Sequence, residues 1–237
     1  MKHIQHLQPS YILHYRPFRN TSLLLDLFTE HHGRIGAVAR GARSTSSKGR
    51  SAHQPFVPLL ISWAGKGELV SVNSIETQSY GIGLTGNALL SGFYLNELLL
   101  RLLHRHDPHP SIFHLYGETL KGLAEGGGER LLRLFEKNLL LELGYAVSLS
   151  QEATTGQPIQ TDKLYYFQSD IGFSEIAPIN TIPPHQIFSG EHLLNFHNDQ
   201  LMDSESLRAA KRLMRLALAP LLGDAVLKTR ELFLQLH

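Results

Sequence analysis

Residues 39–56, "ARGARSTSSKGRSAHQPF", hold Arg40, Arg43, Lys48 and Arg50 among Gly, Ser and Thr, with no acidic side chain. Cations of this kind neutralise phosphates and release counterions, while small neighbours let backbone N–H groups and hydroxyls approach a phosphodiester. Arg34 begins the strand-like run that leads into this stretch. The phosphate-binding set that we predict is therefore Arg34, Arg40, Arg43, Lys48 and Arg50.

The glycine-rich basic stretch does not have the spacing of a nucleotide-phosphate loop. Lys48 follows Ser47 and precedes Gly49, so the G-x-x-x-x-G-K-[ST] pattern fails. No G-x-G-x-x-G opens a helix either. We therefore expect neither nucleotide hydrolysis nor a nucleotide cofactor.

The fourteen histidines do not form a recognisable metal or catalytic pattern. The densest group is His104, His106 and His109, with Asp107 as the only nearby carboxylate, and surface or capping roles suit these side chains. His192 and His197 are five apart, which does not match H-E-x-x-H. There is no G-x-S-x-G, and the acidic residues are scattered. We predict no metal site, no cofactor and no enzymatic activity.

Charge divides the chain into a basic and an acidic part. Residues 1–80 carry nine Lys/Arg and four Asp/Glu, whereas residues 81–237 carry thirteen and seventeen. This asymmetry favours a polyanionic partner for the first part, although a solvated basic surface would give the same counts.

The composition indicates a folded protein of the reducing cytoplasm. The 237 residues suffice for one large or two small domains and include no cysteine. No apolar run is long enough to span a membrane, and "MKHIQHLQPS" lacks the apolar core of a signal peptide. We expect a cytoplasmic, nucleoid-associated location.

Short strand-like runs separated by turn residues fill the first part of the chain. They cover residues 11–16, 22–30, 33–40, 55–63 and 68–76, and "AGKG" (64–67) joins the last two as a hairpin. Five such runs predict a small OB-like β-barrel. Aromatic residues that could stack on bases are Tyr15, Phe18, Phe56 and Trp63, but a barrel-core role is favoured for each and stacking is assigned to none.

Helical periodicity takes over after the barrel. Helices are predicted over 87–104, 111–125, 129–144, 204–223 and 227–237, with Ser111 as a possible cap and Gly144 as a stop. The first three are expected to form a compact bundle. Residues 145–188 lose this period and read as an irregular insertion with one hairpin near "KLYYFQSDIGFSEI".

The order of these features resembles the RecO family of bacterial recombination mediators. The most specific blocks are "ARGAR" (39–43) and "LKTREL" (227–232). Further blocks cover nearly the whole chain: "SLLLDLFTEHHGRIGAVARGARS", "HQPFVPLLISWAGKGEL", "SGFYLNELLLRLL", "RLFEKNLLLELGY" and "LRAAKRLMRLALAPLLGDAVLKTRELF".

The resemblance implies an α+β multidomain fold: an OB-fold nucleic-acid-binding domain at 1–80 and an α-helical domain at 81–237. It also implies a protein that binds single- and double-stranded DNA and anneals complementary strands. With RecR, such a protein helps RecA to displace single-stranded-DNA-binding protein, whose acidic C-terminal tail it binds. RecA is then an indirect partner, and no membrane is involved.

Some members of the family hold a four-cysteine zinc site in the insertion. Here that segment is "SLSQEATTGQPIQTDK" (148–163), without cysteine, so it is expected to be a degenerate zinc-ribbon-like insertion held by packing alone. Basic side chains of the last long helix could receive an acidic peptide tail, although a solvated helix face is an equal interpretation. They are Arg208, Lys211, Arg212 and Arg215.

Other functions stay open at the level of sequence. A basic OB barrel would equally suit an RNA- or ribosome-binding protein. A protein adaptor whose basic part meets an acidic partner is a second alternative. A hydrolase or nuclease that works through the histidines is a third, and metal-dependent turnover would be needed to support it.

Overall fold

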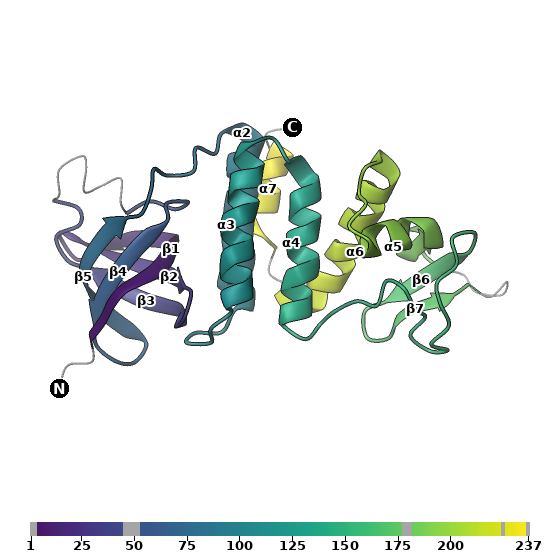
Figure 1. The fold of residues 1–237 in the computed structure, drawn as a ribbon, viewed down its shortest axis with the longest axis horizontal. Helices are drawn as coiled ribbons and strands as arrows, with labels where there is room; N and C mark the ends of the chain where they lie inside the picture. Colours follow the sequence, from purple (N-terminus) through teal and green to yellow (C-terminus); the bar gives the residue numbers. More distant parts are fainter. Residues whose placement is uncertain (1–3, 45–52, 177–181, 224–225, 236–237) are drawn as a thin grey trace. The chain divides into compact units, whose positions relative to one another are not determined.

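The computed structural model describes residues 4–44, 53–176, 182–223 and 226–235 (Figure 1). The chain divides into two compact units, one from Met1–Gly127 with Val226–His237 and the other from Gly128–Ala225. The barrel belongs to the first unit, and the small sheet belongs to the second. The barrel followed by helices confirms the predicted α+β fold. The boundary near residue 80 stays a proposal, drawn from the change from strands to helices.

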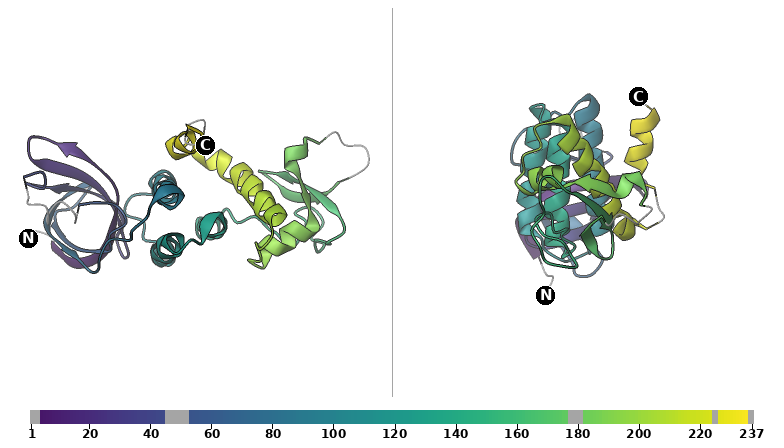
Figure 2. Two further views of the ribbon diagram at one scale, coloured as in Figure 1. Left: turned by 90° about the horizontal axis from the view of Figure 1, so that it is seen from above. Right: turned by 90° about the vertical axis from the view of Figure 1, so that its right-hand side faces the viewer.

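All the strands predicted in the first part of the chain are present and close into a barrel with the order β1-β2-β3-β5-β4 (Figures 1 and 2). β3 and β5 pair in parallel, from Gly36 with Leu69 to Val38 with Ser71. A small five-stranded barrel of this kind is OB-like. The bounds are β1 Ile4–Phe18, β2 Ser22–Thr29, β3 Gly33–Ala39, β4 Leu59–Ala64 and β5 Leu69–Thr77.

Two strand starts differ from the prediction by four residues or more. β1 begins at Ile4 because its polar first residues pair with β4, Gln5 opposite Trp63, which the weak alternation of this segment does not reveal. β4 begins only at Leu59, because proline has no N–H to donate to a ladder and residues 55 and 58 are both proline. The barrel is filled by alternate residues such as Leu25, Leu27, Ile35 and Ile61, each at most 2% exposed.

Two helices of the first unit pack beside the barrel, the second of them through aromatic contacts. They are α2 (Gly86–Leu102) and α3 (Pro110–Ala124). The ring of Tyr11 on β1 lies 5.3 Å from that of Phe113 and 5.0 Å from that of Tyr116. α3 begins at Pro110, with His109 as its N-cap, so the predicted Ser111 cap is wrong. Proline suits the first helical position because no intrahelical partner is lost there.

The C-terminal helix α7 (Lys228–Gln235) is anchored on α2 by one carboxylate. Glu97 accepts hydrogen bonds from the backbone N–H of Lys228 (2.9 Å) and of Thr229 (3.0 Å), and from the Thr229 hydroxyl (2.7 Å). Arg101 pairs with the same carboxylate at 3.0 Å. Burial alone would raise the pKa of Glu97, but these donors outweigh it and lower the pKa below its usual value. A negative charge at this helix N-terminus also satisfies amide groups that have no intrahelical partner.

We expect Glu97→Gln to lower the free energy of unfolding by about 2 kcal/mol at pH 7, because hydrogen bonds to a charged group are lost. The folded pKa is depressed, so this stability is present above the ordinary glutamate pKa and disappears as pH falls through the lowered one. The difference from wild type should therefore shrink below about pH 4. Thermal unfolding across pH measures it, with the exposed Glu118→Gln on α3 as control. A difference that does not change with pH would contradict this role.

The second unit contains α4 (Gly128–Glu142), α5 (Gly190–His197) and α6 (Ser204–Leu222). We expected α4 to belong with the two helices before it, but it falls in the second unit, where it packs against α6. Gly144 follows α4 with φ +80°, and the N–H of Tyr145 returns to the Leu140 carbonyl at 2.8 Å, so the predicted stop is confirmed. α5 was not predicted, because its eight residues are too few for a clear helical period.

The insertion contains the predicted hairpin and an additional strand. The hairpin is β6 (Leu164–Gln168) with β7 (Gly172–Glu175), and β8 (Ile187–Ser189), preceded by a 3₁₀ turn at Pro184–Gln186, pairs with the other edge of β6. Buried rings hold the sheet together: Phe173 lies 5.1 Å from Phe167 and 5.6 Å from Phe188. Such packing is what a cysteine-free insertion requires.

Within the described ranges, no helix has the length and apolar character needed to cross a bilayer.

Candidate nucleic-acid interface

An open groove of about 230 Å³ lies where the end of β1, the end of β3 and the start of β5 meet. On β3 its lining alternates with barrel-core residues, since Ala37 and Ala39 are buried while Val38 between them reaches the groove. We call this hollow the cationic groove. It is lined by Phe18, Arg19, Val38, Arg40, Leu69, Val70 and Ser71.

Cations from two turns converge on this groove. Arg40 is exposed at the end of β3, and Arg19 lies in the β1–β2 turn with its guanidinium 5.2 Å from the centre of the Phe18 ring. Arg43 joins the two turns, because its Nη1 donates to the carbonyls of Arg19 (3.3 Å) and Asn20 (3.2 Å). Among the described residues, no carboxylate pairs with any of these three arginines. The groove therefore presents positive charge that is free to meet an anion.

The predicted basic stretch begins as a tight turn. Gly41 has φ +68°, a conformation that favours glycine, and its carbonyl accepts from the Ser44 N–H at 3.0 Å and the Ser44 hydroxyl at 2.8 Å. The N–H of Arg43 donates to the Thr21 carbonyl at 2.9 Å, which fastens the turn to the start of β2. This geometry holds the exposed Arg40 and Arg43 side chains on the same side as the β1–β2 turn.

Arg34 has a different environment from the other predicted cations. Its Nη1 donates to the carbonyl of Leu100 on α2, and its own carbonyl accepts from the N–H of His106 at 3.0 Å. Burial and the neighbouring Arg105 lower its pKa, while Asp26 acts in the opposite direction. Arg34 thus joins β3 to α2 and to the loop that follows it. The other two predicted cations, Lys48 and Arg50, lie outside the described residues.

A neighbouring ion pair explains why the strand beside Arg34 carries a glycine. Arg105 pairs with Asp26 of β2 at 3.0 Å, directly across from Gly36 of β3. A Cβ at Gly36 would lie 2.7 Å from Arg105 Nη1 and 2.8 Å from the Glu68 carbonyl. The missing side chain at Gly36 leaves room for the Arg105 guanidinium. Arg105, like Arg34, therefore makes its contacts within the first unit.

The structure separates the four aromatic residues that could have stacked on bases. Phe18 lines the cationic groove, and Tyr15 is 41% exposed on β1. Phe56 and Trp63 are buried at 5% and 4% exposure, in agreement with the favoured core role. Phe18 is the member of this set that lies beside groove arginines.

Most of the basic side chains predicted on α6 have internal partners. Arg208 pairs with Glu205, and Lys211 pairs with Glu129. Arg212 donates to the Ile187 carbonyl at 2.6 Å and lies 4.4 Å from the centre of the Phe188 ring, and burial lowers its pKa. Arg215 is exposed and has no ion-pair partner within the described part of the chain. The four side chains therefore do not form one open cationic stripe.

The histidines give no sign of a metal centre in the described residues. No group of three or more His, Asp or Glu side chains lies close enough there to hold a metal ion. His109 pairs with Asp107 at 3.4 Å, and His114 pairs with Glu30 at 2.9 Å. His114 is at the surface, whereas His109 occupies the N-cap position of α3 but is buried and makes no side-chain cap hydrogen bond.

Sequence reasoning missed Arg19 as a member of the interface, and it named Phe18 only among four aromatic candidates without assigning stacking to any of them. Arg19 and Phe18 lie more than twenty residues before Arg40 in the chain, in the turn "RPFRN", and no local pattern connects the two segments. For Arg19 the available signal was the shortage of acids in the first part of the chain, which does not select individual residues.

Comparison with known proteins assigns both parts of the chain to one family. The family model "Recombination protein O N terminal" matches residues 1–80, and "Recombination protein O C terminal" matches residues 84–231. The chain is 45% identical over 226 residues to DNA repair protein RecO of Coxiella burnetii (strain RSA 331 / Henzerling II), covering 95% of this chain and 97% of that protein. It is 43% identical over 230 residues to the protein of the same name from Yersinia enterocolitica (serotype O:8 / biotype 1B, strain NCTC 13174 / 8081), covering 96% and 94%. Since both family models and these full-length relatives cover nearly the whole chain, it belongs to the recombination protein O (RecO) family.

Proposed function

We propose that the protein is a DNA repair and recombination mediator that binds single- and double-stranded DNA and anneals complementary strands. With RecR, it helps to load RecA onto DNA that is coated with single-stranded-DNA-binding protein. Membership of a family whose relatives are named DNA repair proteins supports the repair role. No bond is made or broken in this proposal, and no cofactor takes part.

The observation that carries the proposal is the cationic groove, whose arginines pair with no carboxylate of the described residues. Arg19, Arg40 and Arg43 come from adjacent turns, and Phe18 offers an aromatic surface in the same groove. A positively charged groove with an aromatic side chain is how OB folds hold a single strand. Phosphate contacts of this kind do not depend on sequence, which suits a protein that acts on any damaged site.

Annealing follows from the same charges. Two complementary strands repel one another, and cations that neutralise their phosphates lower the barrier to pairing. A groove that holds the backbone while bases remain outside it would leave those bases free to pair. Lys48 and Arg50 belong to the proposed set as well, because they continue the same basic stretch.

The partners RecR, RecA and single-stranded-DNA-binding protein are part of the proposal. Binding to the acidic tail of the coating protein would bring the cationic groove close to covered strands. The effective concentration of the groove at those strands would then be higher. On α6, Arg215 is the predicted cation that is exposed and unpaired within the described residues. Arg208 and Lys211 would have to exchange their present carboxylate partners for those of the tail.

An RNA- or ribosome-binding protein is the second candidate, because an exposed basic groove on an OB-like barrel does not by itself distinguish RNA from DNA. Affinity for matched RNA and DNA strands at the same salt concentration separates the two. A protein adaptor would show no DNA binding at physiological salt.

The test of the proposed function is the salt dependence of affinity for a labelled single strand, followed by fluorescence anisotropy. The variant Arg19→Ala/Arg40→Ala/Arg43→Ala should lower affinity about tenfold or more. If each guanidinium holds one phosphate, its slope of log affinity against log salt should be less negative by about 2, since each contact contributes about −0.7. Arg40→Ala/Arg43→Ala/Lys48→Ala/Arg50→Ala tests the contribution of the basic stretch in the same way.

A matched variant removes the same number of charges elsewhere. Arg208→Ala/Lys211→Ala/Arg215→Ala should leave the DNA slope unchanged and weaken binding of a labelled acidic peptide. Unfolding midpoints near that of wild type are expected for both triple variants, because exposed side chains contribute little to stability. An unchanged DNA slope in a folded groove variant would overturn the role proposed for the groove.

A further inference from the structure

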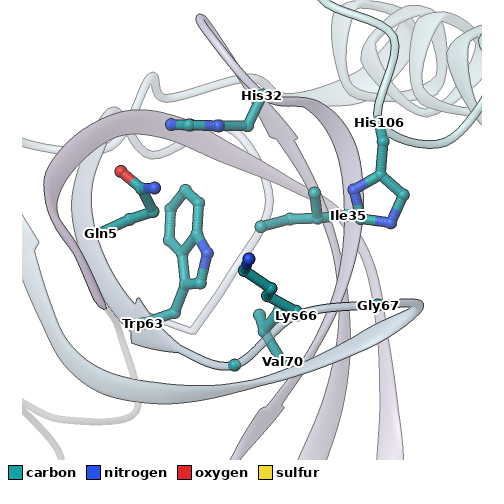
Figure 3. A pocket seen from close by; sticks show the side chains of 9 residues that line it. Gln5, His32, Ile35, Trp63, Lys66, Gly67, Val70 and His106 are labelled. Carbon is teal, nitrogen blue, oxygen red and sulfur yellow. The ribbon is translucent and has the colours of Figure 1, made fainter. Parts of the chain in front are cut away.

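A second, larger hollow of about 340 Å³ opens where the first residues of β1, the β2–β3 turn and the β4–β5 hairpin meet (Figure 3). We call it the Trp63 pocket. Its volume lies in the range that takes a small ligand, about 300–1,000 Å³. The side chains that matter to its chemistry are those of Gln5, His32, Ile35, Trp63, Lys66 and His106.

An aromatic pair forms one side of the Trp63 pocket. The rings of Trp63 and His32 lie 5.3 Å apart at 85°, and Figure 3 shows the His32 ring beyond the six-membered ring of the indole. Both ladders that flank Trp63 are irregular, because the β1–β4 register shifts between Gln5 and Gln8 and the β4–β5 register shifts between Ser62 and Trp63. Bulges of this kind re-aim side chains and are common beside binding sites.

The polar groups of the pocket suit an anionic ligand. Gly65 (φ +121°) and Gly67 (φ +96°) shape the hairpin that carries Lys66, whose ammonium points toward the space beside the indole in Figure 3. No carboxylate of the described residues pairs with Lys66, and no acidic side chain lines the pocket. Gln5 adds an amide that can both donate and accept.

His32 adds a second group that can donate and accept. Burial, then His31 and His106, lower the pKa of His32, which favours the neutral form of its ring. A neutral imidazole donates from one nitrogen and accepts at the other, as the edge of a nucleobase does. A planar heterocycle with a polar edge and an attached phosphate therefore matches the aromatic pair, the amide, the imidazole and the ammonium together.

We propose that the Trp63 pocket receives one unstacked nucleobase of a single DNA strand, with an adjacent phosphate on Lys66. This inference rests on the proposed function and adds to it a site that distinguishes unpaired from paired bases. Val70 of β5 belongs to the linings of both the cationic groove and the Trp63 pocket, and it is buried in the barrel core together with Ile35 and Trp63. In this proposal a strand whose phosphates lie on the groove arginines crosses β5 to place one base in the pocket.

Trp63 makes this proposal directly testable, because it is the only tryptophan in the chain. The full-length protein is titrated with an oligothymidine strand while tryptophan emission and the anisotropy of a labelled strand are both recorded. An abasic strand of equal length keeps the phosphates without the bases, and a duplex keeps the bases paired. We expect the oligothymidine to quench Trp63, and we expect the abasic strand and the duplex to bind by anisotropy without quenching.

Two pocket variants and one groove variant complete the experiment. His32→Ala should weaken oligothymidine binding about tenfold through loss of a contact to the base. Lys66→Gln, on an exposed hairpin, should weaken it about threefold and make the salt slope less negative by about 0.7. The groove variant Arg19→Ala/Arg40→Ala/Arg43→Ala should weaken affinity but reach the same quench at saturation.

The two readouts separate failure of the pocket from failure of the proposed function. Binding by anisotropy with unchanged Trp63 emission, or equal quenching by the abasic strand, would overturn the pocket and leave the DNA-binding proposal standing. Absence of binding by anisotropy would overturn both. Thymidine 5′-monophosphate distinguishes a free nucleotide from a strand: quenching by the monophosphate as strong as that by the oligothymidine would overturn the strand assignment.

Discussion

Gly33→Ala should destabilise the protein by about 3–5 kcal/mol, more than any change at an exposed position. Gly33 begins β3 with φ +63°, a conformation that L residues adopt at a cost. A Cβ there would also lie 2.2 Å from the Asp107 carbonyl oxygen and 2.6 Å from the Asp107 nitrogen. These are backbone atoms, so the barrel turn and the α2–α3 loop would have to move apart.

Gly41→Ala is the matched control for this prediction. Gly41 has a similar φ of +68°, but a Cβ there would meet only the Ser44 hydroxyl at 3.7 Å. Gly41→Ala should lower the free energy of unfolding only by the cost of the left-handed backbone, about 1–2 kcal/mol. Urea unfolding of both variants measures the difference. Equal losses would show that the loop yields to the new methyl group without cost.

Asn96→Leu should lower the free energy of unfolding by about 3 kcal/mol, because it strands two buried polar groups. β1 carries a bulge between Ile12 and His14, and the carbonyl of Leu13 accepts from Asn96 Nδ2 at 2.8 Å. Asn96 Oδ1 in turn accepts from the fully buried Tyr116 hydroxyl at 2.6 Å. Burial and, less strongly, Tyr11 raise the pKa of Tyr116 well above its usual value, so its hydroxyl remains a donor.

A double-mutant cycle isolates this network. Tyr116→Phe removes the hydroxyl with little change of shape and should lower stability by about 1–2 kcal/mol. The double variant should lose less than the sum of the single losses, because the hydroxyl stranded by Asn96→Leu is then absent. Thermal or urea unfolding of the four proteins gives the coupling. Additive losses would contradict a shared network among β1, α2 and α3.

These two sites matter to the DNA proposal because they hold the barrel against the helices of the first unit. Gly33 and Asn96 both join barrel strands to α2, to α3 or to the loop between them. Neither touches the cationic groove, so losses of stability at these positions are separable from losses of phosphate contacts. Variants of the groove arginines should show the opposite pattern, with weaker DNA binding and near-normal stability.

The sequence by itself determined the barrel strands, the long helices and the family, but not the short elements α5 and β8. Strand alternation, helical periodicity and turn residues act over a few neighbours, so the barrel strands, the long helices and the stop at Gly144 could be predicted. Their ends were less certain where proline or polar pairing intervened, as at the starts of β1 and β4. The basic stretch after β3 could be recognised because its composition is local.

Only the tertiary structure decided which cations are free to meet DNA. Arg34 and Arg40 look alike in sequence, yet Arg34 donates to the Leu100 carbonyl while Arg40 remains exposed. Arg19 joins the groove because the β1–β2 turn lies against Arg43, and the Trp63 pocket unites segments from Gln5 to His106. Such partnerships depend on how strands pair and where loops close, and those contacts form between residues that are distant in the chain.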